Sequence, residues 1–316
     1  MRGLLLIALA FLWTTPALAR PNCLRQALAG DPANVRLMCS DTLTQSIVIR
    51  RDVKIDGNGQ TIDGNGLLLQ IERGATVVLR NIRLHGIGIQ NRGTLRLERA
   101  VLKAAQTGIY NTGALSMTDS LVAQHDNGIA NYGGSVVVEN VTFWQNRRAG
   151  LYNSKHASVL RCTFSENYRG IDNASGDVVV ANTIFQGNNA TRPHEIGAGI
   201  ANSGKLQVYN SSFLENKAAG GGAAFGSHLG GTAKVANTLI ASDSPQVNCM
   251  GPIIDGGHNR QYPGQTCGTT IPQYDGANPG SGDPAICNAQ PVAGVDRLGA
   301  KRKQQCDIGA VEISAR

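Results

Sequence analysis

The stretch that decides the fold is residues 127–153, NGIANYGGSVVVENVTFWQNRRAGLYN. It begins and ends on the same phrase, in which Gly-Ile or Gly-Leu is followed by any residue and then Asn. The phrase recurs about every 20 residues, with its last position at Asn91, Asn111, Asn131, Asn153, Asn173 and Asn202. Such a repeat is typical of one coil of a parallel β-solenoid, in which each coil covers the apolar face of the previous one. The sequence therefore predicts a solenoid.

Apolar positions in each repeat fall into three columns around a polar corner residue. The corner residues are Asn81, Arg99, Asp119, Asn140, Arg161, Asn182, Asn210 and Asn237. Residues two and four before each corner are apolar, and because side chains alternate along a strand both should point to one side. A third apolar residue follows the corner by three positions. We predict that these columns form the core, with Leu79, Val138, Phe164 and Val180 among its members.

Asparagines also form columns in the repeat. Identical carboxamides stacked at the spacing of adjacent strands can donate to one neighbour and accept from the other. We therefore predict an internal hydrogen-bonded ladder through Asn131, Asn153 and Asn173. A second column follows the apolar residue after the corner by three positions and comprises Asn146, Asn167, Asn188 and Asn216.

The two ends of the chain differ from the repeat. Residues 1–19 combine Arg2, an apolar run and a Pro-Ala-Leu-Ala ending, which is typical of a secretory signal peptide. We expect export to the periplasm, the cell surface or the extracellular space. No later stretch has the ~20 apolar residues of a membrane helix, so we expect no transmembrane segment in the mature chain. The predicted divisions are a cap at 20–45 with a short helix, the β-helix at 46–241, and an irregular C-terminal wrap or cap at 242–316.

Seven cysteines are an odd number, so at least one stays unpaired. Proximity in the sequence favours three disulfides. Cys162 occupies a repeat position that Ala, Ser, Val or Thr holds in other coils, which predicts a free, packed thiol. The candidate pairs are Cys23 with Cys39, Cys249 with Cys267, and Cys287 with Cys306.

The pattern Phe-x-x-Asn followed by Gly-Ile-x-Asn resembles the repeat of polymorphic outer-membrane proteins and, more broadly, of right-handed parallel β-helix proteins of the pectate-lyase-like superfamily. Residues 23–28 are similar to the opening of many secreted members, and residues 306–312, Cys-Asp-Ile-Gly-Ala-Val-Glu, are similar to their ending. The resemblance implies an all-β fold, a single-stranded right-handed parallel β-helix with an N-terminal helical cap and a disulfide-stapled C-terminal wrap. We expect nine to eleven coils. Cys287 stands where such endings usually have Asp, which fits a bridge to Cys306.

The formal charge of +7 suits an acidic polysaccharide or a cell-envelope glycan as partner, whereas the aromatic content of 5% disfavours an extended stacking surface. We expect no nucleic-acid partner. The first hypothesis is a secreted, non-catalytic protein that binds glycan or another surface component. The alternatives are a polysaccharide lyase, epimerase or hydrolase acting on acidic polysaccharide, and a purely structural or adhesive element. The oligomeric state stays open.

A candidate site follows from the loops after the third apolar column. The repeat is interrupted between residues 189 and 198, and charged residues of three coils could converge there; the same residues also fit a solvated edge. On this fold a lyase or epimerase needs a basic residue to take a proton and a cation to neutralise the substrate carboxylate. The candidates are Arg147, Arg148, Glu166, Tyr168, Arg169, His194 and Glu195, and Lys103, His125, Asp126, Arg192 and Lys217 lie along the same edge.

Metal and cofactor sites are not expected. Asp56 and Asp63, each in the sequence Ile-Asp-Gly-Asn-Gly, offer oxygen ligands for Ca²⁺. Their spacing lacks the nine-residue period of calcium-binding β-rolls, so we interpret them as turn residues. The six histidines do not fall at metal-ligand spacing.

Overall fold

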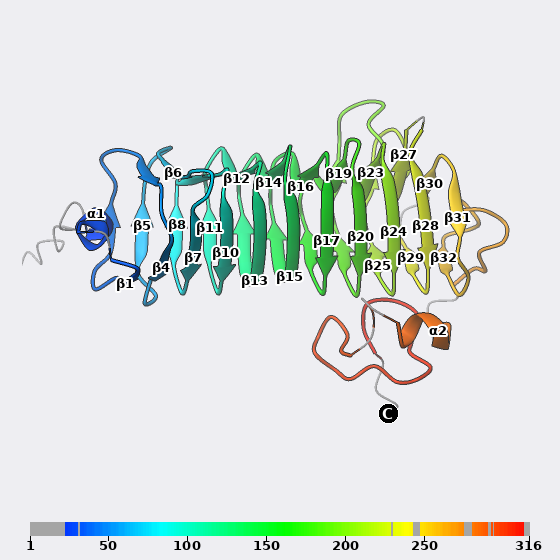
Figure 1. The fold of residues 1–316 in the computed structure, drawn as a ribbon. Coiled ribbons are helices and arrows are strands. Elements are labelled where there is room, and N and C mark those ends of the chain that lie inside the picture. The colour runs from blue at the N-terminus through cyan, green and yellow to red at the C-terminus, as the bar shows by residue number, and fades with distance from the viewer. Residues whose placement is uncertain are drawn as a thin grey trace, which may run out of the picture.

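The structure is a computed structural model that describes residues 23–312 apart from residues 31, 229, 243–246, 275–279, 290–291 and 293. Its main body is a parallel β-helix of about eleven coils, seen side-on in Figure 1. The predicted all-β solenoid and its coil number are confirmed. The predicted signal peptide, residues 1–19, lies outside the described residues.

Successive coils stack into a ten-stranded parallel sheet, here called sheet B. It contains β3 (Ile47–Ile49), β6 (Leu68–Ile71), β9 (Gly88–Asn91), β12 (Thr107–Asn111), β14 (Asn127–Asn131), β16 (Ala149–Asn153), β19 (Arg169–Asn173), β23 (Ile200–Asn202), β27 (Phe225–Ser227) and β30 (Cys249–Met250).

A second, twenty-stranded sheet, here called sheet A, takes two strand segments from each coil, one before and one after the corner. The first row is β1 (Asn34–Arg36), β4 (Val53–Asp56), β7 (Thr76–Arg80), β10 (Thr94–Glu98), β13 (Ala114–Ala123), β15 (Ser135–Trp144), β17 (His156–Leu160), β20 (Asp177–Ala181), β24 (Lys205–Tyr209), β28 (Thr232–Ala236) and β31 (Ile253–Asp255). In the second row β13 and β15 continue through the corner beside β2 (Asp41–Thr42), β5 (Thr61–Asp63), β8 (Arg83–His85), β11 (Val101–Lys103), β18 (Thr163–Ser165), β21 (Ile184–Gln186), β25 (Ser212–Leu214), β29 (Leu239–Ala241) and β32 (Arg260–Tyr262).

All eight predicted corner residues have a left-handed backbone, with φ between 42° for Asn210 and 53° for Asn140. Asn tolerates this region better than most residues because its short polar side chain bonds locally, which accounts for its frequency there. The turn places the two halves of sheet A at an angle. All three predicted apolar columns consequently point inward.

The predicted core is confirmed. Leu79, Val138, Phe164 and Val180 are buried, and all the other members of the three columns are buried with them. The rings of Phe143, Phe164, Phe185 and Phe213 stack with centroids 4.5, 4.9 and 4.5 Å apart. Each buried side chain of this size contributes ~1.5–3 kcal/mol of transfer free energy, so the columns dominate stability.

Both asparagine ladders are present. In sheet B, the Nδ2 of Asn131 donates to the Oδ1 of Asn153 at 2.8 Å, and the Nδ2 of Asn153 donates to the Oδ1 of Asn173 at 3.1 Å. In the second column, Asn146 donates to Asn167 in the same way at 2.8 Å. The three predicted disulfides are also formed, and Cys162 is free and buried. Burial raises the pKa of the Cys162 thiol to about 12, so this cysteine stays protonated.

The N-terminal cap is helix α1 (Cys23–Leu28), which buries Leu24 against the first coil. The backbone N–H of Leu24 donates to the carboxylate of Asp41 at 2.9 Å. Val35, also within the predicted cap, lies in β1 and points into the core. Regular strand pairing therefore already begins within the predicted cap.

At the other end, regular pairing continues past residue 241, because β30, β31 and β32 pair in parallel with the preceding coil. The loop after β32 then covers the last coil. The side chain of Gln261 donates to the carbonyls of Gly268 and Ile271 and accepts from the N–H of Cys267. Ile271 is fully buried in the main core. This loop, closed by the Cys249–Cys267 disulfide, protects the apolar end of the helix.

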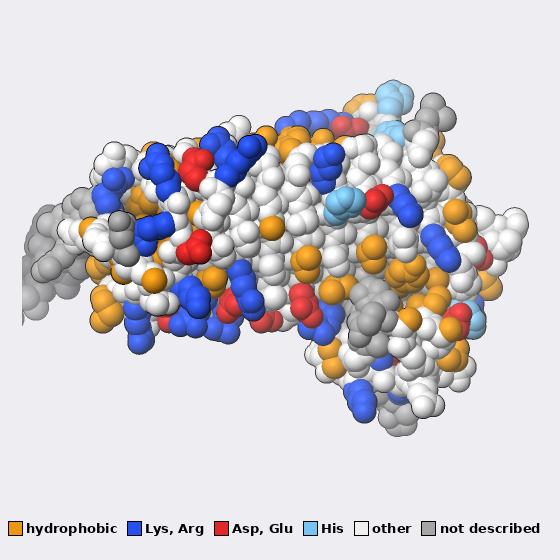
Figure 2. Space-filling view, in the orientation of Figure 1, with side chains coloured by type: hydrophobic (Ala, Val, Ile, Leu, Met, Phe, Trp, Pro, Cys, Tyr) orange, Lys and Arg blue, Asp and Glu red, His pale blue; other side chains and the backbone are white. Residues whose placement is uncertain are grey.

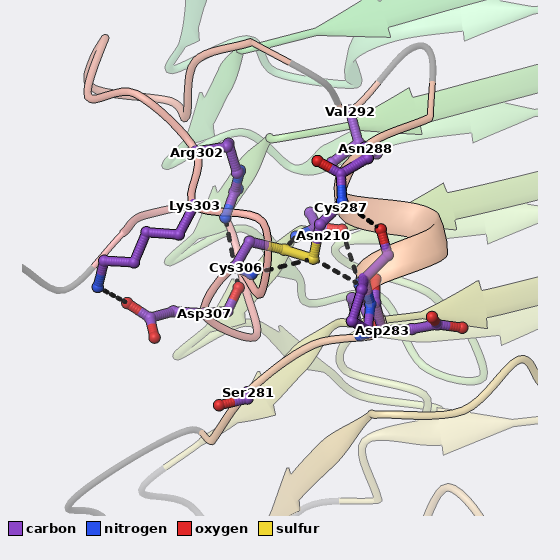
Figure 3. Close-up of a disulfide and its surroundings, with 12 residues drawn as sticks. Asn210, Ser281, Asp283, Cys287, Asn288, Val292, Arg302, Lys303, Cys306 and Asp307 are labelled. Carbon is purple, nitrogen blue, oxygen red and sulfur yellow. Dashed lines mark hydrogen bonds and ion pairs between the residues drawn. A yellow bond between two sulfur atoms is a disulfide. The ribbon is translucent and has the colours of Figure 1, made fainter.

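Residues 280–312 form a C-terminal tail that packs beside the β-helix (Figure 1). This tail includes the short helix α2 (Pro284–Cys287). Figure 3 shows the Cys287–Cys306 disulfide of this tail against the corner residue Asn210, whose Nδ2 donates to the Sγ of Cys306 at 2.8 Å. Ile308 is buried and Val311 is partly buried. The tail lies along the corner column: the Nδ2 of Asn182 donates to the carbonyls of Val292 and Val295, and the N–H of Asp283 donates to the Oδ1 of Asn237.

Candidate functional site

A pocket of about 200 Å³ lies on the wall of the helix beside sheet B. Two coils supply its floor through β16 and β19, and the interruption at residues 189–198 folds over it. It is lined by Asn127, Tyr132, Arg148, Tyr152, Tyr168, Arg169, Asp172, Arg192 and Glu195. The predicted convergence of charged residues from neighbouring coils is thus found for part of the candidate set.

The interruption is held in place by a small sheet. Strand β22 (Asn189–Ala190) pairs with β26 (Lys217–Ala218) of the next coil. Ala190, Ala198 and Ala218 form a separate apolar cluster, and the ring of Tyr168 packs against it. The pocket therefore has a supported wall.

Glu195 is the most connected carboxylate of the pocket. It accepts a short hydrogen bond from the hydroxyl of Tyr168, and its Oε2 lies 3.2 Å from a guanidinium nitrogen of Arg169. Arg192 lies 3.7 Å from its Oε1 and 5.3 Å above the Tyr168 ring. Burial, and then the hydrogen bond to Glu195, raises the pKa of Tyr168. The phenol is consequently fixed as a protonated donor.

Arg169 bridges two carboxylates, because its other terminal nitrogen lies 3.2 Å from Asp172. Only 15% of the Arg169 side chain is exposed, and its Nε is buried without a hydrogen-bond partner among the described residues. Burial raises the pKa of Asp172 even though Arg169 acts in the opposite direction. Asp172 is the variable residue of a Gly-Ile-x-Asn phrase and therefore faces outward from β19.

A row of tyrosines leads to the pocket along the outer face of sheet B. Tyr110 and Tyr132 have ring centroids 5.1 Å apart, and Tyr132 and Tyr152 have centroids 5.0 Å apart. Tyr110 and Tyr132 are exposed. Beyond Tyr110 the row reaches a second hollow of about 280 Å³ near Leu68 and Gln90.

Arg148 is the free cation of the pocket. Its side chain is exposed and forms no ion pair within the described part of the chain, whereas Arg169 and Arg192 are engaged by acids. The neighbouring Arg147 points elsewhere, with its Nε 2.8 Å from the carboxylate of Asp126. The charge of Arg147 is thus neutralised by Asp126, whereas the charge of the adjacent Arg148 is not neutralised by a described residue.

Three of the sequence candidates lie outside the pocket. Arg147 pairs with Asp126, Glu166 accepts from the side chain of Gln145 at 2.9 Å, and His194 is exposed at a left-handed position of the interruption. Conversely, sequence reasoning missed Tyr132, Tyr152 and Asp172. The sequence does contain a pattern that could have identified these residues, because each occupies or adjoins the outward position of the Gly-Ile-x-Asn phrase.

His125 belongs to the interior and not to the edge. It is buried, its Nδ1 lies 3.1 Å from the N–H of Ala105, and its Nε2 lies 3.1 Å from the carbonyl of Leu102. His125 is therefore the first member of the second ladder, because its backbone N–H donates to the Oδ1 of Asn146. Burial is the main cause that lowers its pKa.

The two aspartates considered for Ca²⁺ are the last residues of β4 and β5, directly before the turns that follow these strands. Asp56 accepts from the N–H of Asn58 and the side chain of Asn81, and Asp63 pairs with His85 at 2.8 Å. Within residues 23–312, as far as they are described, no three His, Cys, Asp or Glu side chains are grouped to hold a metal ion.

The family model for the right-handed β-helix region matches residues 75–239. The chain belongs to the right-handed β-helix family. This membership and the fold suggest a place in the pectate-lyase-like superfamily. The matched region includes every residue of the pocket. Neither the curated proteins nor the solved structures give a significant match to the chain. No helix in the described ranges has the length and apolar character needed to cross a membrane.

Proposed function

We propose that this β-helix protein is exported and binds acidic glycan in the pocket beside β16 and β19. The observation that carries the proposal is the uncompensated guanidinium of Arg148 next to the aromatic wall of Tyr132 and Tyr152. Guanidinium groups bind carboxylates in a forked geometry, and a pyranose ring needs an apolar wall with polar groups around it. The pocket combines the two.

The charge of the pocket favours an anion. Its three arginines outnumber its two carboxylates, and Asp172 and Glu195 are both already held by Arg169. A substrate carboxylate would thus meet Arg148 without displacing an internal ion pair. The tyrosine row extends the surface over several coils toward the N-terminus, so a glycan chain has room on that side of the bound residue.

The test is calorimetric titration of the purified chain with oligosaccharides of uronic acids and with neutral oligosaccharides of the same length. We expect binding of the acidic series, and we expect Arg148→Gln to weaken it about tenfold, since a hydrogen bond to a charged group is worth ~1.5–3 kcal/mol. Arg147→Gln is the matched control, because it removes the same charge one residue away at a compensated position. Equal losses in the two variants, or equal binding of neutral sugars, would contradict the proposal.

A second candidate function is cleavage of the bound polysaccharide. Tyr168 and Asp172 favour it, because both have a raised pKa and both border the space that a sugar would occupy. The Tyr168 phenol keeps its proton at neutral pH and can serve as a general acid. Incubating the protein with a panel of uronate polymers separates the candidates: unsaturated products absorb in the ultraviolet, and hydrolysis releases reducing ends. If Tyr168→Phe produced both signals as fast as the parent, Tyr168 would have no catalytic role.

A further inference from the structure

The net charge of the chain is concentrated in its N-terminal third. Residues 23–112 contain 12 Lys and Arg against 7 Asp and Glu, whereas residues 113–316 contain 15 of each. On the face shown in Figure 2, basic side chains gather over the half of the helix that carries the N-terminal coils. A neutral C-terminal part attached to a basic N-terminal part gives the molecule a directed electrostatic field.

A large hollow lies within this basic third, on sheet A and away from the sheet B pocket. It has a volume of about 660 Å³ and runs across the outer face of β1, β4, β7 and β10. Its charged lining is Arg36, Lys54, Asp56, Arg80, Arg96 and Glu98.

Two outward columns of this face differ in their charge. In the first, the strand register places Arg36, Asp56, Arg80 and Glu98 on successive strands, so that charges alternate and compensate one another. Arg80, for example, lies 3.6 Å from Asp56. This column has no net charge to offer a ligand.

The second column is the basic one. The register places Lys54, Val78 and Arg96 on β4, β7 and β10. Lys54 is exposed and forms no ion pair with any residue in the described ranges, and Arg96 is 60% exposed although Glu98 lies 2.6 Å away. Strands in a sheet are ~4.8 Å apart, so the backbone positions of Lys54 and Arg96 are about 10 Å apart along the hollow, with an apolar residue between them.

We propose that this hollow is a second binding site, for a linear glycan that carries sulfate or phosphate groups. This open hollow, called the trough below, carries cations at intervals along its length. Such an arrangement suits an extended chain with anionic groups at regular intervals. A bilayer surface is flat and would not enter a trough. None of the residues lining the trough is aromatic, which leaves nothing on which nucleic-acid bases could stack.

The experiment is fluorescence anisotropy of the full chain with a labelled, fully sulfated heparin octasaccharide. We expect binding that weakens as salt rises, because the contacts are exposed charges. The double variant Lys54→Gln/Arg96→Gln should bind at least tenfold more weakly. Lys234→Gln is the matched control, since Lys234 holds the same outward column position far along sheet A. It should bind like the parent.

Three results would overturn the proposal: parent-like binding by the double variant, an equal loss in Lys234→Gln, or desulfated heparin binding as tightly as the sulfated probe. Single-stranded DNA or phosphatidylserine vesicles that bound more tightly than the glycan and lost binding in the double variant would assign the trough to another polyanion. Heparin also carries uronate carboxylates, so the double variant is repeated in an Arg148→Gln background, where its loss of heparin binding should persist. This separates the trough from the sheet B pocket, so either proposal can fail while the other stands.

Discussion

Replacing His125 with asparagine should remove a loss of stability that the parent chain shows at mildly acidic pH. His125 fills the position that Asn146 and Asn167 fill in the following coils. There, Asn146 donates through its Nδ2 to the carbonyl of Val122 at 3.2 Å. The Nε2 of His125 lies equally close to the carbonyl of Leu102, so an asparagine side chain can take over this contact in the same backbone frame.

The sign of the effect follows from the lowered pKa. The folded chain holds the ring neutral below its ordinary pKa of 6.5, whereas the unfolded chain protonates it there. Between 6.5 and the lowered pKa, the unfolded state therefore binds more protons, and the free energy of unfolding falls as pH falls. The slope approaches ~1.4 kcal/mol per pH unit while one full proton separates the two states. Well above 6.5 the ring is neutral in both states, so His125 contributes no slope there.

The assay is urea unfolding of parent and His125→Asn at several pH values from 7.5 down to 4.5. The difference in unfolding free energy should be constant above pH 7 and should move in favour of the variant below it. His194→Asn serves as the control, since His194 is exposed and its left-handed backbone suits asparagine. A parent-minus-variant difference independent of pH would refute the assignment of His125 to the ladder interior.

Further expectations concern the ladder, the core and the tail. Asn153→Leu should lower the unfolding free energy by ~1–3 kcal/mol, because buried partners on both sides lose a hydrogen bond. Asn91→Leu should cost less, since Asn91 ends the ladder and its Oδ1 has no partner in the described structure; thermal unfolding compares them. Phe164→Asp should cost several kcal/mol by placing a charge between stacked rings, and a parent-like melting temperature would contradict the register. Replacing Cys287 and Cys306 by alanine should cost roughly 3 kcal/mol and speed hydrogen exchange in the tail but not in sheet B.

The solenoid could be predicted from the sequence because each coil repeats the same pattern of inward apolar residues around a corner. An apolar residue such as Val138 faces inward for the same reason in every coil, and stacking turns one pattern into a column. The corner asparagines mark where the backbone must become left-handed. Cysteine pairs close in sequence, such as Cys23 with Cys39, also needed no long-range information.

The candidate site was only partly predictable because it depends on contacts between coils and on one interruption. Glu195 reaches Tyr168 and Arg169 only because β22 pairs with β26 and folds residues 189–198 back over the wall. Nothing local in the sequence distinguishes Arg147 from Arg148, yet one is compensated by Asp126 and the other lines the pocket. The sequence predicts the disulfide of the tail but leaves open whether the tail wraps the wall or caps the last coil.

The architecture itself explains how a chain with few aromatic residues can assemble a concentrated site. Outward positions about 20 residues apart in sequence become neighbours across adjacent coils, as Tyr152 and Asp172 do in β16 and β19. The ladder and the phenylalanine column fix this backbone without using the outward positions, so those positions can carry any chemistry. A regular wall alone is shallow. The interruption adds the missing side of the pocket, and its alanine cluster supports Tyr168 independently of the main core. Substitutions at Arg148 or Glu195 should therefore alter ligand binding while the β-helix keeps its stability.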